Sequence, residues 1–244
     1  MNYKSFIFYC LIITVFSCDS ETILVEDIPL GKEYYPIAIG NTWEYQYDSI
    51  VYDASLGRVD TLSGFIQEKL SELIDHSKYL IKRKWKENVS DPWIETDRWL
   101  LIKEENRIIK IEENLPFIKL VFPLSTGLSW DGNSLFEEST SITIAGETLI
   151  PYFNWKYEIL SKDQMFSHEG IAVEEVVHIR QVNDTTNLEL RFSEEFYAPN
   201  IGMVEKKLSI LDCNCFGVDR NIPWEQKAEK GFILKQKLIN YSVQ

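Results

Sequence analysis

Hydrophobic and polar residues alternate along several segments of this chain. Trp43–Asp48 alternates aromatic with polar side chains, Tyr79–Lys86 sets apolar residues against lysines, and Leu188–Phe192 sets apolar residues against charged ones. A period of two is typical of strands that bury one face and expose the other. The pattern therefore predicts antiparallel strands whose apolar side chains turn toward a core.

Turn signals separate these segments. Glu104–Asn106 and Asn183–Asn187 each lie between two apolar stretches and predict hairpins. Ile222–Lys230 is the best candidate for a short helix, with Pro223 near its start. We predict a single β domain over residues 34–244. The expected fold class is mainly β, with antiparallel sheets arranged as a curved sheet, a sandwich or an open half-barrel and with little helix.

The first 17 residues have the character of an export signal. Lys4 is the one charged side chain in this stretch, and Phe6–Phe16 is almost wholly apolar. The apolar run is about a dozen residues long, which is short of the roughly 20 that a membrane-spanning helix needs. We therefore predict that residues 1–17 are a signal peptide that is removed.

The segment Val15–Cys18 (VFSC) resembles the lipobox of bacterial lipoproteins. The resemblance implies that Cys18 becomes the new N-terminus and carries a diacylglycerol. Acyl chains such as palmitate would then hold the protein to a membrane. The alternative is a cysteine that happens to end a plain signal peptide. Residues 18–33 are polar and acidic, and we expect them to tether the domain to the lipid.

Three short phrases in the mature chain resemble a group of Bacteroidetes lipoproteins that has no agreed activity. They are GNTWEY with DSIVYD in residues 40–53, FPL with WDGN in residues 122–133, and YAPNIGMV in residues 197–204. The resemblance implies a mainly β fold and an outer-membrane location, and it brings no mechanism. Asp19 and Glu21 fit an inner-membrane retention signal of the enterobacterial type or a surface-export signal of the Bacteroidetes type. The face of the membrane therefore stays open.

The charge of the chain excludes one class of partner. There are 38 acids against 25 bases, which gives a formal charge of -13. A protein that binds nucleic acid needs a basic footprint, and no stretch supplies one. Adjacent acids recur, among them Glu112-Glu113 and Glu194-Glu195. Neighbouring strand residues point to opposite faces, so these pairs do not by themselves form a glycosidase pair, and we expect most of them to be solvated.

Cys213 and Cys215 are separated by one residue. An exported protein meets an oxidising compartment in which disulfides persist. We expect a local disulfide or two structural thiols. A redox pair is one alternative, although its usual spacing has two residues between the cysteines. A metal site is another, although no further Cys or His lies nearby in the sequence.

The sequence contains neither the GxSxG elbow of hydrolases nor a glycine-rich phosphate loop. We expect no catalytic residue, no cofactor and no metal, and therefore no enzyme activity. Trp85, Trp93 and Trp99 lie on consecutive predicted strands. Their first interpretation is core packing. The alternative is a ligand platform on which sugar rings stack.

Three tripeptides that begin with aspartate resemble the O-glycosylation signal of Bacteroidetes. The resemblance makes Ser49, Thr61 and Thr185 candidate glycan acceptors. We treat them as modification sites and not as active-site groups.

The leading expectation is an outer-membrane lipoprotein that acts as a non-catalytic binding or structural module. Its partners would be the membrane, through the lipid, and a glycan or a surface-assembly protein. One alternative is a hydrolase of envelope glycans, which needs a cleft with convergent titratable groups. The other is a carrier of lipid or lipoprotein with an open β half-barrel, which needs a deep apolar cavity.

Overall fold

The computed structural model describes residues 30–215 and 221–244. The predicted signal peptide and the predicted lipidation site at Cys18 lie outside the described residues. Among the described residues, no helix combines the length and the apolar character that crossing a membrane requires.

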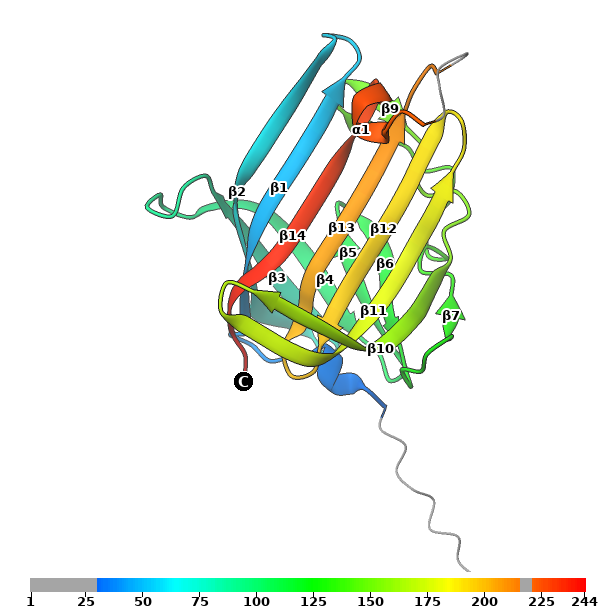
Figure 1. Ribbon diagram of the computed structural model, residues 1–244. Coiled ribbons are helices and arrows are strands. Elements are labelled where there is room, and N and C mark those ends of the chain that lie inside the picture. The colour runs from blue at the N-terminus through cyan, green and yellow to red at the C-terminus, as the bar shows by residue number, and fades with distance from the viewer. Residues whose placement is uncertain (1–29, 216–220) are drawn as a thin grey trace, which may run out of the picture.

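Twelve of the described strands form one antiparallel sheet that curves around an interior (Figure 1). The strand order is β6-β5-β4-β3-β2-β1-β14-β13-β12-β11-β10-β7, so the first and last strands of the chain pair with each other. The strands of this sheet are β1 (Thr42–Asp53), β2 (Arg58–Asp75), β3 (Lys78–Lys86), β4 (Ile94–Lys103), β5 (Arg107–Glu112), β6 (Leu115–Val121), β7 (Ser129–Trp130), β10 (Tyr157–His168), β11 (Ile171–Thr185), β12 (Glu189–Ala198), β13 (Gly202–Asp212) and β14 (Lys230–Ser242). The smaller elements are β8 (Ile142–Ile144) paired with β9 (Glu147–Leu149), the 3-10 helix η1 (Lys32–Tyr34) and the helix α1 (Trp224–Lys227).

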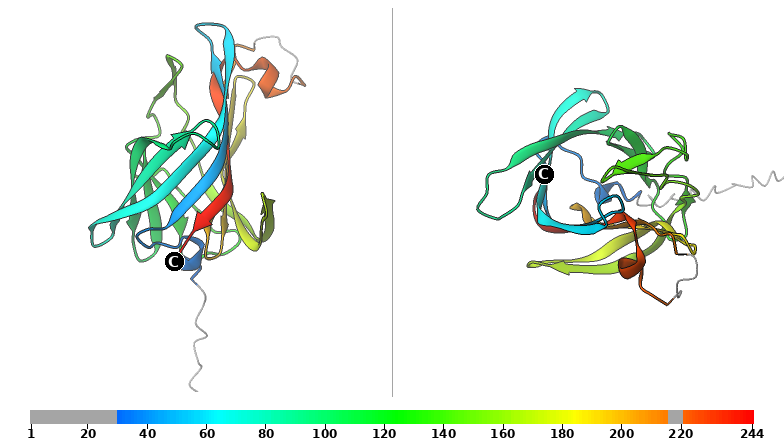
Figure 2. Two further views of the ribbon diagram at one scale, coloured as in Figure 1. Left: turned by 90° about the vertical axis from the view of Figure 1, so that its left-hand side faces the viewer. Right: turned by 90° about the horizontal axis from the view of Figure 1, so that it is seen from above.

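The two edges of the sheet, β6 and β7, approach each other. The backbone N–H of Ile118 donates to the carbonyl of Gly132 at 2.8 Å, and Trp130 Nε1 donates to the carbonyl of Ile118 at 2.8 Å. Seen from above, the sheet therefore curls almost into a ring (Figure 2). The predicted fold class is confirmed, and of the three arrangements considered the curved sheet is the one found. Edges that meet in this way leave few backbone groups free to pair with another chain.

The N-terminal segment Leu30–Asn41 crosses one end of the interior, at the lower end of Figure 1. It bonds to strands and turns on several sides of the sheet. These bonds are Leu124 N–H to Leu30 O, Asn200 N–H to Glu33 O, Tyr34 Oη to Glu175 O and Gly40 N–H to Leu70 O. The expected tether ran to Glu33, but the residues from Leu30 onward already bond to the folded domain.

The local predictions succeed at the turns. β4 and β5 are joined at Glu104–Asn106, and β11 and β12 form the second predicted hairpin. The helix α1 begins after Pro223 and is shorter than the predicted stretch Ile222–Lys230. It lies on the outside of the sheet at the end opposite the N-terminal segment (Figure 1). There Trp224 packs on a small cluster of Tyr52, Leu211 and Ile233.

The expected orientation of β12 is wrong. Leu188, Leu190 and Phe192 were expected to face the core, but the buried side chains of this strand are those of Arg191 and of the alternate residues that follow it, Ser193–Tyr197. The interior beside β12 is polar, so its polar row points inward. Alternation identifies which residues share a face, but it does not say which face is inside.

Candidate functional site

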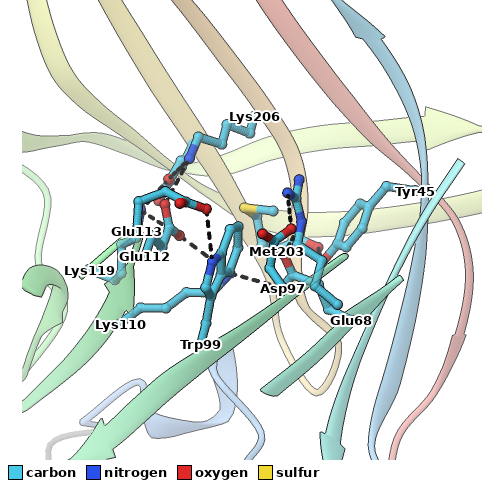
Figure 3. Close-up of polar contacts among 12 residues, drawn as sticks. Tyr45, Glu68, Asp97, Trp99, Lys110, Glu112, Glu113, Lys119, Met203 and Lys206 are labelled. Atoms are coloured by element: carbon cyan, nitrogen blue, oxygen red, sulfur yellow. Dashed lines mark hydrogen bonds and ion pairs between the residues drawn. The ribbon is translucent and has the colours of Figure 1, made fainter. Parts of the chain in front are cut away.

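Eight charged side chains gather inside the sheet, and Figure 3 shows Glu112, Lys119 and Lys206 among them, directed toward one another. We call this set the interior charge cluster. It has four cations and four carboxylates from seven strands: Arg83, Lys110, Lys119 and Lys206, with Glu68, Asp97, Glu112 and Glu195. Charges this deeply placed are rare unless they are paired.

Two short ion pairs connect strands that are not neighbours in the sheet. Lys119 Nζ lies 2.8 Å from Glu195 Oε1, and Lys110 Nζ lies 2.8 Å from Glu68 Oε2. The hydroxyl of Tyr197 donates to the other oxygen of Glu195 at 2.6 Å. Because other strands separate β6 from β12 and β5 from β2, these pairs reach across the interior.

Glu112 lies at the centre of the cluster. Its Oε1 is 3.4 Å from both Lys110 Nζ and Lys119 Nζ, and its Oε2 is 3.4 Å from Lys206 Nζ. Lys206 Nζ is also 3.5 Å from Glu195 Oε1. The cluster therefore joins the β5–β6 side of the sheet to the β12–β13 side (Figure 3).

Arg83 and Trp99 extend the cluster toward β3 and β4. Arg83 Nη1 lies 3.5 Å from Asp97 Oδ2, and its Nε lies 3.8 Å from Glu68 Oε1. The guanidinium is 4.4 Å from the centre of the Trp99 ring, and Lys110 Nζ is 4.6 Å from it. Cations over an indole are attracted to its electron-rich face, which holds this ring in place.

The pairing fixes the ionisation of the cluster at neutral pH. Burial opposes ionisation of Glu195, but Lys119 and Lys206 outweigh it and lower its pKa to about 2. Burial also opposes ionisation of Glu112, yet the surrounding ammonium groups hold its pKa well below the usual range. Burial works against the charge of Lys119 in turn, but Glu112 and Glu195 raise its pKa. These groups neither release nor take up protons near pH 7.

A cavity of about 200 Å³ lies beside the cluster. Polar groups of the cluster line one part of it, together with Gln181, Ser193 and Gln236. Aromatic rings line another part: Tyr47, Trp99, Phe117, Tyr152, Trp155 and Tyr157. A few polar groups among aromatic walls are typical of small-ligand sites.

Two residues of this wall are placed by β-bulges. Ile108 and Ile109 pair with Leu120 and Ile118, so Lys119 is the extra residue of β6. In the same way, Gln181 is the extra residue of β11, between positions paired with Glu194 and Ser193. A bulge redirects a side chain without ending the sheet, and bulges are common beside functional sites.

Three donors in the wall have no hydrogen-bond partner within the described part of the chain. They are the amide nitrogens of Gln181 and Gln236 and Nε of Arg83. The two glutamines are only 2% and 4% exposed. Gln181 Oε1 accepts a bond from Ser193 Oγ at 2.6 Å, which fixes the side chain. A buried donor without a partner costs about 1–3 kcal/mol, so two such amides beside one cavity call for an occupant.

The three tryptophans of the predicted platform do not come together. Trp99 lines the cavity, Trp85 packs edge-on against Tyr47, and Trp93 lies beside Lys86. Trp99 is also buried in the hydrophobic core. The aromatic surface that the structure offers is therefore the cavity wall.

None of the other predicted site residues in the described part of the chain lines the cavity. Cys213 and Cys215 are joined by a disulfide where the chain leaves β13. Thr61 and Thr185 are exposed. Ser49 is 6% exposed and pairs with Leu234, a residue of the cavity wall. Its hydroxyl therefore lies inside the sheet and not on the surface.

Most of the adjacent acids were expected to be solvated, and Glu112 and Glu195 are exceptions. Glu195 is 1% exposed, because its strand turns a polar row inward. A signal was present in the sequence: Lys110 and Lys119 each stand alone within an apolar run. A lone charge in such a run predicts a buried partner of opposite sign.

No family model and no curated protein matches the sequence. A solved structure of a protein described as a "putative lipoprotein" from Parabacteroides distasonis resembles the chain with a TM-score of 0.39 and 11% sequence identity. The match covers 86% of this chain and 98% of that one. A likeness of this size carries neither fold nor function to the present protein.

Proposed function

We propose that this protein is a lipid-anchored, non-catalytic binding module of the outer membrane, which holds a small ligand in the cavity inside its sheet. The observation that carries the binding role is the 200 Å³ cavity, whose wall contains two buried glutamines with amide nitrogens that have no hydrogen-bond partner among the described residues. The lipobox-like segment at Val15–Cys18 supports the anchor.

The ionisation of the cluster favours binding over hydrolysis. A glycosidase needs one carboxylic acid that gives up a proton and a second carboxylate that acts as nucleophile or base. Glu112 and Glu195 share the ammonium groups of Lys119 and Lys206, which hold the pKa of both carboxyls low. Neither carboxyl holds a proton to give at neutral pH.

The cavity also favours a small ligand over a lipid. A carrier would bury acyl chains against apolar walls, whereas this wall contains charged groups and amides. Its volume of about 200 Å³ lies below the roughly 300–1,000 Å³ of drug-sized ligand pockets.

The anchor is tested by intact-mass analysis of the protein extracted from membranes. The expected mass is that of a chain beginning at an acylated Cys18. A retained Met1, or an unmodified start at residue 18 or later, would overturn the anchor.

The binding role is tested by thermal shift on the detergent-extracted protein with neutral sugars, uronic acids, amino acids and fatty acids. At least one class should raise the melting temperature of the wild type. Leu234→Trp fills the cavity and should abolish that rise, while Lys235→Trp, whose side chain is exposed on the same strand, should keep it. If no class raises the melting temperature, cavity binding is wrong.

A further inference from the structure

We propose that the cavity binds one ring of a neutral saccharide and discriminates against charged sugars of the same size. This inference rests on the proposed binding function and specifies its ligand class.

The charge balance around the cavity argues for a neutral ligand. The interior charge cluster has four cations and four carboxylates, each within 4 Å of an opposite charge. A ligand carboxylate would compete for ammonium groups that Glu112 and Glu195 already occupy. A ligand amine would bring a fifth cation into the same buried space. Either charge would lose its hydration without gaining a free counter-ion.

The unused hydrogen-bond capacity argues for a ligand rich in oxygen. Among the described residues, the buried wall donors without a hydrogen-bond partner are the amide nitrogens of Gln181 and Gln236 and Nε of Arg83, which has only a 3.8 Å ion pair with Glu68. Hydroxyl and ring oxygens of a saccharide accept such bonds. Gln236 on β14 stands beside Lys206 on β13, and Gln181 projects from the bulge of β11. The two glutamine donors therefore lie along the β11–β14 side of the cavity, and Arg83 on β3 lies beside Trp99.

The aromatic side of the wall supplies the complementary surface. Trp155, Tyr152 and Phe117 line the cavity together with Trp99. The centre of the Tyr152 ring lies 5.4 Å from that of Trp155 and 5.6 Å from that of Phe117. A sugar ring presents polar oxygens at its edge and C–H groups on its faces. Aromatic walls on one side and donors on the other fit both surfaces of one such ring.

The test is calorimetric titration of the full chain, extracted in a polyoxyethylene detergent that contains no sugar. Glucose, galactose, mannose and N-acetylglucosamine are the neutral probes, and glucuronate, galacturonate and glucosamine are the charged ones. We expect at least one neutral sugar to bind with a Kd at least about tenfold below that of its charged counterpart.

Variants of the two glutamines locate the binding. Gln236→Leu and Gln181→Met should each raise the Kd for the neutral sugar by about tenfold or more, because each removes a donor to a ligand oxygen. Gln46→Leu makes the same chemical change on the outward face of β1 and should bind like the wild type.

The outcomes separate this inference from the proposed function. If a uronate, an amine sugar or a fatty acid binds instead, and Leu234→Trp removes that binding, the neutral-saccharide inference is overturned while cavity binding stands. If a neutral sugar binds but both amide variants keep its affinity, the cavity donors are not its site and the inference also fails. If no probe of any class binds, both proposals fall.

Discussion

The two ends of the interior differ in how their polar groups are satisfied. At the end crossed by the N-terminal segment, Trp43 Nε1 donates to the carbonyl of Ile201 at 2.5 Å, and Tyr45 Oη donates to that of Met203 at 3.1 Å. Farther along the same sheet, the amide nitrogens of Gln181 and Gln236 are buried and have no hydrogen-bond partner in the part of the chain that the structure describes.

The cavity is also larger in the part of the interior where these glutamine nitrogens lack partners among the described residues. The cavity at the end that the N-terminal segment crosses, beside Tyr35 and Trp43, measures about 20 Å³, whereas the cavity beside Gln236 measures about 200 Å³. Protein interiors normally fill such space and pair such donors. One sheet therefore contains a half packed for stability and a half left open, with the interior charge cluster between them.

The largest effect is expected from disrupting the interior charge cluster, which lies between the packed half and the open half. Lys119→Met leaves Glu195 and Glu112 buried with fewer counter-charges, so we expect a loss of about 3–5 kcal/mol in the free energy of unfolding. Urea unfolding measures it. Lys207→Met, on the outward face beside Glu205, is the control and should change stability by less than about 0.5 kcal/mol.

A double variant sharpens this result. Adding Glu195→Leu to Lys119→Met removes the orphaned carboxylate, so much of the lost stability should return. If Lys119→Met alone is as stable as Lys207→Met, the cluster does not hold the two sides of the sheet together.

Acid should weaken the interior charge cluster before it affects the end that the N-terminal segment crosses. Glu195 has a folded-state pKa of about 2 against an ordinary value of 4.5, so its ion pairs stabilise the fold above pH 4.5. That stability, up to about 3 kcal/mol, is lost as the pH falls from about 4.5 toward 2. Urea midpoints measured from pH 7 to pH 3 should fall, and they should fall less in Glu195→Gln.

A smaller effect is expected from removing the hydroxyl of Tyr197, which bonds to Glu195 of the interior charge cluster. Tyr197→Phe removes the hydroxyl that donates to Glu195 at 2.6 Å and keeps the ring in place. A hydrogen bond to a charged group contributes about 1.5–3 kcal/mol, so urea unfolding should report a loss in that range. Tyr79→Phe, on a half-buried strand position, serves as the matched control and should lose less.

The sequence predicted the strands and turns well because they depend on local patterns. Trp43 and Tyr45 face the core as their alternation requires, and Glu104–Asn106 turns where it was expected to. The polar interior could not be predicted in the same way. The neighbours of Glu195 in space are Lys119 and Lys206, and only the curvature of the whole sheet brings them together.

The smallest expected effect has the opposite sign. Gln236→Leu replaces a buried amide, whose nitrogen has no hydrogen-bond partner among the described residues, with an apolar group of similar size, so it should leave the free energy of unfolding unchanged or raise it by up to about 1 kcal/mol. A glutamine kept for structure would lose stability on the same change, whereas one kept for a ligand loses only affinity. Urea unfolding without ligand, set beside the sugar titration of the same variant, distinguishes the two. A loss of more than about 1 kcal/mol would mean that the open half is packed for stability like the other.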